Sequence, residues 1–301
     1  MGDRTLTRLA DGGGFYEGPR WHDGRWWVSD FYGRTVSTFD TAGHEEQVLT
    51  VEGQPSGLGW LPDGSLLVVS MKDHRLLRRD ADDGSVDVVA DLSDHSGGHL
   101  NDMVVDAEGR AWVGNFGFDL MASADPAPAD VVRVDPDGTV TVAAGGLLFP
   151  NGSVVTPDGS TLIVGETLGC RYTAWTIEAD GTLVDRRVWA QLAPTPALGT
   201  FAEMLPHVTV APDGCCLDAE DHIWAADAIG GACLRIAPGG EVVDRVDAPD
   251  GLSAFACMLG GDDGRTLLLC TAPDFFEHLR TSARDAVLLT TTVDVPHAGL
   301  P

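Results

Sequence analysis

The sequence predicts an all-β protein, a six-bladed β-propeller, and two observations support this prediction. One is a short unit in which a polar residue, an apolar run, a tight turn and a second β-rich run follow one another. Its clearest copy is FPNGSVVTPDGSTLIVGET at residues 149–167, where Pro-Asp-Gly between two apolar runs is typical of a β-hairpin. The other is that the unit occurs six times, with turn acids 40, 45, 50, 62 and 43 residues apart. Short strands that repeat every 40–50 residues or so are typical of a propeller. The turn acids are Asp23, Asp63, Glu108, Asp158, Glu220 and Asp263.

No linker or low-complexity stretch divides the chain, so we expect a single domain over residues 1–301. Residues 4–10 alternate apolar and polar side chains, and we expect them to form a strand that pairs in the last blade and closes the ring. Trp21, Trp26 and Trp27 are expected to pack between blades. The blades are expected at residues 15–52, 55–94, 99–148, 149–192, 206–249 and 253–296.

Three segments interrupt the repeat. Residues 119–130 and 193–212 adjoin polar strand ends, so each is expected either to form part of a substrate pocket at the channel mouth or to be a packed surface loop. Residues 273–286 predict a polar, helical segment, and residues 291–301 are expected to supply a final strand and an extended end. The candidate pocket residues of the second segment are Phe201, Met204, Leu205 and His207.

The composition argues against several classes of function. The formal net charge of −27 argues against binding to nucleic acid or to an anionic membrane surface. No apolar run approaches the roughly 20 residues of a membrane span, and the start MGDRTLTRLADGG lacks the apolar core of a signal peptide. The six cysteines show no CxxC spacing and are expected to be buried free thiols, which favours a cytoplasmic location.

Two columns of mostly polar residues flank the hairpins. In a propeller the first strand of each blade lines the central channel and the second runs antiparallel to it, so both columns should meet at one channel mouth. Carboxylates that point at a shared axis repel one another, and a cation held by oxygen ligands removes that repulsion. The alternative is that these residues only satisfy backbone groups at blade junctions, which is our expectation for Glu166 and Asp227. The first column is Glu17, Ser56, Asn101, Asn151, Asp213 and Ala256, and the second is Asp30, Ser70, Asn115, Glu166, Asp227 and Thr271.

Four motifs resemble the senescence-marker-protein (regucalcin)/gluconolactonase/luciferin-regenerating-enzyme family. They are EGPRW at 17–21, LND at 100–102, PNG at 150–152 and APDGCCLDAEDHIWAAD at 211–227, and with the six-fold pattern the resemblance covers almost the whole chain. The resemblance implies a six-bladed propeller with one divalent cation at the channel mouth. It implies that Glu17, Asn151 and Asp213 hold this cation.

The resemblance also implies a substrate side of the site. Asn101, followed by Asp102, would contact the substrate or a cation-bound water. Many sugar lactonases of the family have an Arg two residues before this Asn, where this sequence has His99, and Gly commonly stands where this sequence has Met103. Both departures disfavour an aldonolactone as the substrate.

We therefore expect a divalent-metal-dependent hydrolase of cyclic esters, a gluconolactonase-like lactonase acting on a small molecule. The resemblance assigns the catalytic base to Asp213, which would take a proton from the attacking water. Oxygen ligands favour Ca²⁺, while Mg²⁺, Mn²⁺ and Zn²⁺ stay open. No Gly-rich phosphate loop and no GxSxG motif is present, so neither a nucleotide cofactor nor a serine nucleophile is expected. The alternatives are a phosphotriesterase-like or other ester hydrolase on the same fold, and a non-catalytic calcium- or ligand-binding propeller.

Overall fold

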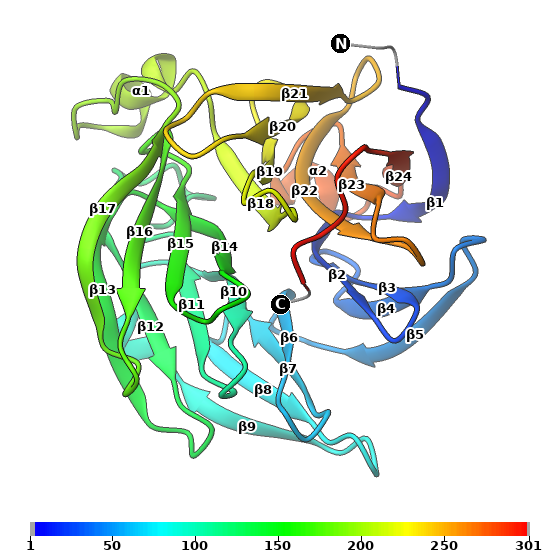
Figure 1. Cartoon of the computed structure of the whole chain (residues 1–301), viewed down its shortest axis with the longest axis horizontal. Coiled ribbons are helices and arrows are strands. Elements are labelled where there is room, and N and C mark those ends of the chain that lie inside the picture. The colour runs from blue at the N-terminus through cyan, green and yellow to red at the C-terminus, as the bar shows by residue number, and fades with distance from the viewer. Residues whose placement is uncertain (1–3, 300–301) are drawn as a thin grey trace.

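The sheets form a closed ring. In the computed structural model, which describes residues 4–299, twenty-four strands make six four-stranded antiparallel sheets around a central axis (Figure 1). This confirms the six-bladed propeller. From the inner strand outward, the sheets are β2 (Tyr16–His22), β3 (Arg25–Asp30), β4 (Thr35–Phe39) and β5 (Glu45–Thr50); β6 (Pro55–Trp60), β7 (Leu66–Ser70), β8 (Arg75–Arg79) and β9 (Val86–Asp91); β10 (Leu100–Val105), β11 (Ala111–Asn115), β12 (Ala129–Val134) and β13 (Val140–Leu147); β14 (Pro150–Val155), β15 (Thr161–Glu166), β16 (Arg171–Ile177) and β17 (Leu183–Gln191); β18 (Pro212–Leu217), β19 (Ile223–Asp227), β20 (Ala232–Ile236) and β21 (Val242–Asp247); and β22 (Ser253–Gly260), β23 (Thr266–Ala272), β24 (Ala286–Thr292) and β1 (Thr7–Gly13).

In five of the six blades, the turn between the two inner strands forms where an acid precedes a glycine. Between β14 and β15, the Asp158 carboxylate accepts a hydrogen bond from the backbone N–H of Ser160 at 3.0 Å, and Gly159 adopts a φ of 71°. The same arrangement joins β6 to β7, where Asp63 accepts from Ser65 and Gly64 has a φ of 84°. A positive φ is accessible to glycine without a steric penalty, so Asp-Gly fixes the turn and, with it, the register of the two strands.

Aromatic side chains pack between neighbouring sheets. Trp21 and Trp26 are buried against Gly260 of β22, where an added Cβ would lie 2.6 Å from both indoles. Glycine is therefore needed at this junction between the first and last blades. Trp27 packs edge-on against Trp60 of the second blade, with ring centroids 5.3 Å apart. The expected role of the three tryptophans between blades is confirmed.

Strand β1 closes the ring by pairing with β24, from Thr7 opposite Thr290 to Gly13 opposite Ala286. The closing strand was expected at residues 4–10 and lies at Thr7–Gly13 instead. The difference arises because two register shifts, after Arg8 and after Asp11, extend the pairing through a segment whose sequence does not alternate. The closure by the N-terminal strand is confirmed.

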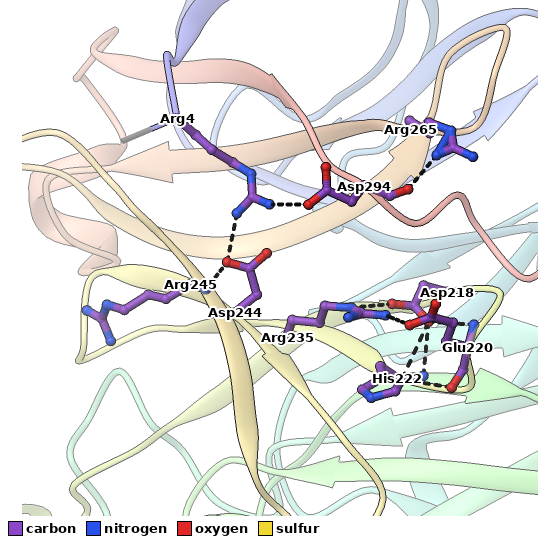
Figure 2. Close-up of polar contacts among 9 residues, drawn as sticks. All are labelled: Arg4, Asp218, Glu220, His222, Arg235, Asp244, Arg245, Arg265 and Asp294. Carbon is purple, nitrogen blue, oxygen red and sulfur yellow. Dashed lines mark hydrogen bonds and ion pairs between the residues drawn. The ribbon is translucent and has the colours of Figure 1, made fainter. Parts of the chain in front are cut away.

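Ion pairs link the outer parts of the last two blades (Figure 2). Arg4, which precedes β1, donates to Asp244 of β21 at 2.7 Å and lies 3.4 Å from Asp294. In the fifth blade, the buried Asp218 accepts from Arg235 at 2.6 Å and from the backbone N–H of Glu220, which holds the turn between β18 and β19. The segment before β1 is thus tied to the neighbouring blade as well as to its own.

The segments that interrupt the repeat differ in structure. Residues 193–211 carry the short helices α1 (Phe201–Met204) and η2 (Leu205–His207), and α2 (Glu277–Arg280) confirms the helical segment expected in the last blade. A further short helix, η1 (Ser93–His95), follows β9. The final strand, expected within residues 291–301, is β24 at Ala286–Thr292, because its pairing with β23 begins at Val287. Of the helices in residues 4–299, none has the length and apolar character needed to cross a membrane.

Candidate functional site

A register shift near the start of every inner strand determines where the residues of the first column lie. In β14, Pro150 pairs with Glu166 and Ser153 with Val164, so the residues between them leave the regular ladder. Such bulges re-aim side chains and are common beside functional sites. In the first five blades the first-column residue is the second residue of the inner strand and lies at this irregularity. In the last blade the same register places Phe255 at this position, because Ala254 pairs with Thr271 as Leu100 pairs with Asn115, whereas Ala256 had been expected there.

Glu17 of β2 and Asp213 of β18 bring two carboxylates together at one end of the channel. Glu17 is 6% exposed, and Asp213 keeps part of its surface open to a pocket above it. Burial, with the nearby Asp213 as the second cause, raises the pKa of Glu17 well above its usual range. Burial also raises the pKa of Asp213, to about 8, although a hydrogen bond from Asn151 opposes the shift. Without a positive partner, this pair favours protonation over two adjacent charges.

Two amides complete this group. Asn151 of β14 donates from Nδ2 to Thr167 Oγ1 at 3.1 Å and also hydrogen bonds to Asp213. Asn101 of β10 is 5% exposed, and among the described residues its Nδ2 has no hydrogen-bond partner. A buried donor without a partner costs free energy, so it marks a place where a ligand or water completes the structure.

The donor set of this group fits a hard divalent cation. Two carboxylates with raised pKa values and the amide oxygen of Asn151 converge from different blades, and all three offer oxygen. Within residues 4–299, no three His, Cys, Asp or Glu side chains gather as a metal cluster, so any such site here depends on amides as well as carboxylates. A cation would offset the burial, and the repulsion from neighbouring carboxylates, that raise both pKa values.

Arg20 and Asp102 form a buried ion pair inside the channel. Arg20 Nη2 lies 3.0 Å from Asp102 Oδ1, and the two side chains are 3% and 4% exposed. Arg20 also donates to the carbonyl oxygens of Met103 and Pro19 at 2.6 and 2.8 Å. Asp102 does not line the pocket, in contrast to the substrate contact expected of it. Its carboxylate raises the pKa of Glu17 and of Asp213, so it lies close behind them.

A pocket opens above the ring and encloses about 970 Å³ of atom-free space, including the part open to solvent. Glu17, Asn101, Asn151 and Asp213 lie on its lining, as does His99, whose pKa is lowered by burial. Much of the remaining lining is apolar and aromatic. The neutral imidazole of His99 can accept as well as donate a hydrogen bond toward this space.

Residues 119–130 and 193–212, the two long interrupting segments, both contribute to the pocket. Of the two alternatives expected for them, a substrate pocket or a packed surface loop, the structure has the first. Leu120 and Met121 come from the segment after β11, and Phe201 and Leu205 from the segment before β18. Two of the expected residues do not line it. Met204 is 1% exposed and packs into the core, because it lies on the inner side of α1. His207 ends η2 and is exposed.

Residues of the second column hold the backbone that leads into the inner strands. Asp30 accepts hydrogen bonds from the backbone N–H groups of Gly14 and Phe15 at 2.8 and 3.0 Å. Glu166 accepts from Leu148 N–H, and Asp227 from Ala211 N–H, both at 2.9 Å. The expectation that Glu166 and Asp227 cap strand ends is confirmed.

Apart from His99, two sets of pocket residues were not identified from the sequence, although the repeat register locates them. Each ring residue of the first five blades has a pocket residue two positions before it, and each second-column residue of these blades has one directly after it. The position of Arg20 inside the channel was also not predicted, because nothing in EGPRW indicates which way its Arg side chain points. The first set is Phe15, Gln54, His99, Phe149 and Ala211, and the second is Phe31, Met71, Phe116, Thr167 and Ala228.

The chain resembles known proteins in sequence and in structure. The model of the SMP-30/Gluconolactonase/LRE-like family matches residues 15–273. The chain is 29% identical over 275 residues to the pentonolactonase XacC of Haloferax volcanii. This alignment covers 89% of this chain and 85% of that protein. It is 26% identical over 211 residues to a 6-deoxy-6-sulfogluconolactonase of Pseudomonas putida, covering 69% and 66% of the two chains.

Solved structures show the same architecture. The calcium-binding protein regucalcin of Agrobacterium tumefaciens superposes with a TM-score of 0.79 at 22% identity, over 99% of this chain and 97% of that chain. A gluconolactonase of Xanthomonas campestris superposes with a TM-score of 0.71 at 24% identity, over 98% and 91% of the two chains. At these identities the likeness shows the fold.

Proposed function

Because the chain belongs to the SMP-30/gluconolactonase/LRE-like family, we propose that it is a hydrolase of cyclic esters, a lactonase that depends on a divalent cation. Relatives named pentonolactonase and 6-deoxy-6-sulfogluconolactonase support the activity. The observation that carries the proposal is the carboxylate pair of the buried Glu17 and the partly buried Asp213, joined by two amides on the floor of the pocket.

Glu17, Asn151 and Asp213 would hold the cation. Their oxygen donors favour Ca²⁺, and the name of the calcium-binding neighbour supports that choice, with Mg²⁺, Mn²⁺ and Zn²⁺ as the other candidates. When bound, such a cation supplies a Lewis acid for the ester carbonyl.

The side chains of this site would act as follows. Water attacks the carbonyl carbon, the Asp213 carboxylate takes its proton, and the ring C–O bond breaks as the leaving oxygen is protonated, which gives a hydroxy acid. The unpartnered Asn101 Nδ2–H donates a hydrogen bond to the substrate or to the attacking water. Asp102 and Arg20 act behind them: their ion pair fixes the strand from which Asn101 projects.

The six buried free thiols support a reducing compartment such as the cytoplasm for this enzyme.

A panel of lactones and aryl esters tests the function. Protein stripped of metal is assayed by pH-stat with Ca²⁺, Mg²⁺, Mn²⁺ or Zn²⁺ added singly, and we expect lactone hydrolysis that needs an added cation. Turnover of aryl esters or phosphotriesters without any lactone would favour the other hydrolase on this fold. Cation binding by calorimetry, with no turnover of any compound, would favour a binding protein.

A further inference from the structure

Phenylalanine is concentrated at one place in this protein. The chain has ten phenylalanines, and eight of them line the pocket above the candidate catalytic residues. No described lysine or arginine lines it. So many aromatic rings around one cavity exceed what blade packing requires, because tryptophan, valine and leucine fill the spaces between the sheets elsewhere. The cavity is shaped for a ligand with apolar surface.

The rings form two walls. One wall comes from the third and fourth blades and from α1, where Phe116 stacks on Phe149 at 4.6 Å and Phe118 lies 6.2 Å from Phe201. The other comes from the first and last blades, where Phe15 lies 4.8 Å from Phe255 and Phe255 lies 6.3 Å from Phe275.

The walls face each other across the axis. Inner strands contact in the order β2, β6, β10, β14, β18, β22 and back to β2, so the third blade is opposite the last and the fourth is opposite the first. No ring pair within contact distance joins one wall to the other in the described residues. The space between the walls is a slot with the polar group of Glu17 and Asp213 at its floor.

Few polar groups are left in the slot for a ligand rich in hydroxyls. The Tyr32 hydroxyl donates to Phe275 O at 2.7 Å, and Thr167 Oγ1 donates to Pro212 O at 2.8 Å. Glu277 at the rim is paired with Lys72. Beyond the proposed cation ligands, His99, Asn101 and Gln54 are the lining side chains whose polar groups can still donate a hydrogen bond. These suffice for one ester group, whereas each sugar hydroxyl buried without a partner costs free energy.

We propose that the substrate is an uncharged lactone with a hydrophobic, aromatic or alicyclic body, and that sugar lactones are poor substrates. The inference rests on the proposed lactonase function. The ester group lies on the polar floor beside Asn101 and Asp213, and the hydrophobic body lies in the slot between the two aromatic walls. Hydrolysis consumes one water, breaks the ring ester bond and releases a hydroxy acid whose proton a pH-stat detects.

The first experiment compares dihydrocoumarin with gluconolactone and xylonolactone on the cation-loaded protein. Each kcat/KM is divided by the spontaneous hydrolysis rate of that lactone, so that intrinsic reactivity does not enter the comparison. We expect the ratio for dihydrocoumarin to exceed those of the sugar lactones by about tenfold or more. A higher ratio for either sugar lactone would overturn the inference and leave the lactonase function standing.

The second experiment measures binding without turnover. Dihydrocarbostyril is the lactam isostere of dihydrocoumarin, and its Kd is measured by calorimetry beside that of gluconolactam. We expect the hydrophobic lactam to bind at least about tenfold more tightly. If no lactone or ester is hydrolysed with any cation, the proposed function fails, and this titration still decides the ligand class: equal or weaker binding of dihydrocarbostyril overturns it.

A variant and its matched control locate the effect. Phe201 lines the slot and is only partly buried, so Phe201→Ala should fold; Leu198, in the same segment, is exposed and outside the lining. For Phe201→Ala we expect the KM of dihydrocoumarin and the Kd of dihydrocarbostyril to rise about tenfold, with kcat changed by less than about threefold. Leu198→Ala should change each value by less than about twofold. Equal effects of the two substitutions would show that the slot does not hold the ligand.

Discussion

Arg20→Met should destabilise the protein strongly, because it leaves a buried carboxylate without its partner. In the native protein Arg20 Nη2 lies 3.0 Å from Asp102, both side chains are at most 4% exposed, and two backbone carbonyls also depend on the guanidinium. Removal of one partner of a buried ion pair costs about 3–5 kcal/mol. At about 2.1 cal/mol/K per residue, the unfolding entropy of 301 residues is about 0.6 kcal/mol/K, so Tm should fall by about 5–8 °C.

The measurement is thermal unfolding of metal-free protein, with an exposed ion pair as the matched control. Arg8 lies 2.8 Å from Asp11, but the two side chains are 67% and 55% exposed. Such pairs contribute about 0–1 kcal/mol, so Arg8→Met should lower Tm by less than about 2 °C. If Arg20→Met also falls within that range, the buried pair does not hold the channel together.

The double variant Arg20→Met, Asp102→Leu isolates the cause. Replacement of a whole buried ion pair by apolar residues is often nearly neutral, so we expect it to recover most of the Tm lost in the single variant. A double variant as unstable as Arg20→Met would show that the loss comes from packing or from the freed carbonyls of Met103 and Pro19. Adding cation should raise the Tm of Arg20→Met more than that of the native protein, because Arg20 is a positive charge near Glu17.

Three further predictions concern the site. Asp213→Asn keeps an oxygen ligand but loses the charge and the base, so at saturating cation its kcat should fall by about 10²–10⁴. A full native kcat in Asp213→Asn would place the base elsewhere. Asn101→Ala should leave the Kd of the cation, measured by calorimetry, nearly unchanged. Glu17→Gln should weaken cation binding by calorimetry and also reduce the Tm gain on adding cation; an unchanged Kd would remove Glu17 from the ligands. The pKa values of Glu17 and Asp213 are raised in the metal-free fold, Asp213 to about 8, so their stabilising effect is full below about pH 4 and is lost as pH rises through the folded-state pKa. Scanning fluorimetry should therefore show the Tm of metal-stripped protein falling between pH 5 and 8 relative to cation-loaded protein, and parallel curves would contradict this.

The sequence predicted the features that repeat and missed those that depend on a single contact. Turn acids at a regular spacing located six hairpins, and the ring position followed from them for Glu17, Asn101, Asn151 and Asp213. The sixth copy failed because the residue at this position is Phe255, so no polar side chain marked the register and Ala256 was expected there instead.

Single long-range contacts leave no periodic signal. Asp102 faces Arg20 and not the pocket, and Arg20 is 82 residues away in the chain. The aromatic slot was missed for a different reason: phenylalanine beside a strand end is usually core, and only the closed ring shows that eight of these side chains share one cavity.

Closure of the ring by β1 sets an order of events during synthesis. Protein chains are made at roughly 5–20 residues per second, so the stretch from Gly13 to Thr292 takes about 14–56 s to follow β1 out of the ribosome. During that time β1 has no β24 to pair with, and the last blade lacks its outermost strand. While unpaired, β1 is short and largely polar, so it is a poor template for pairing with another chain. Of the strands described here, the first in the chain pairs with the last.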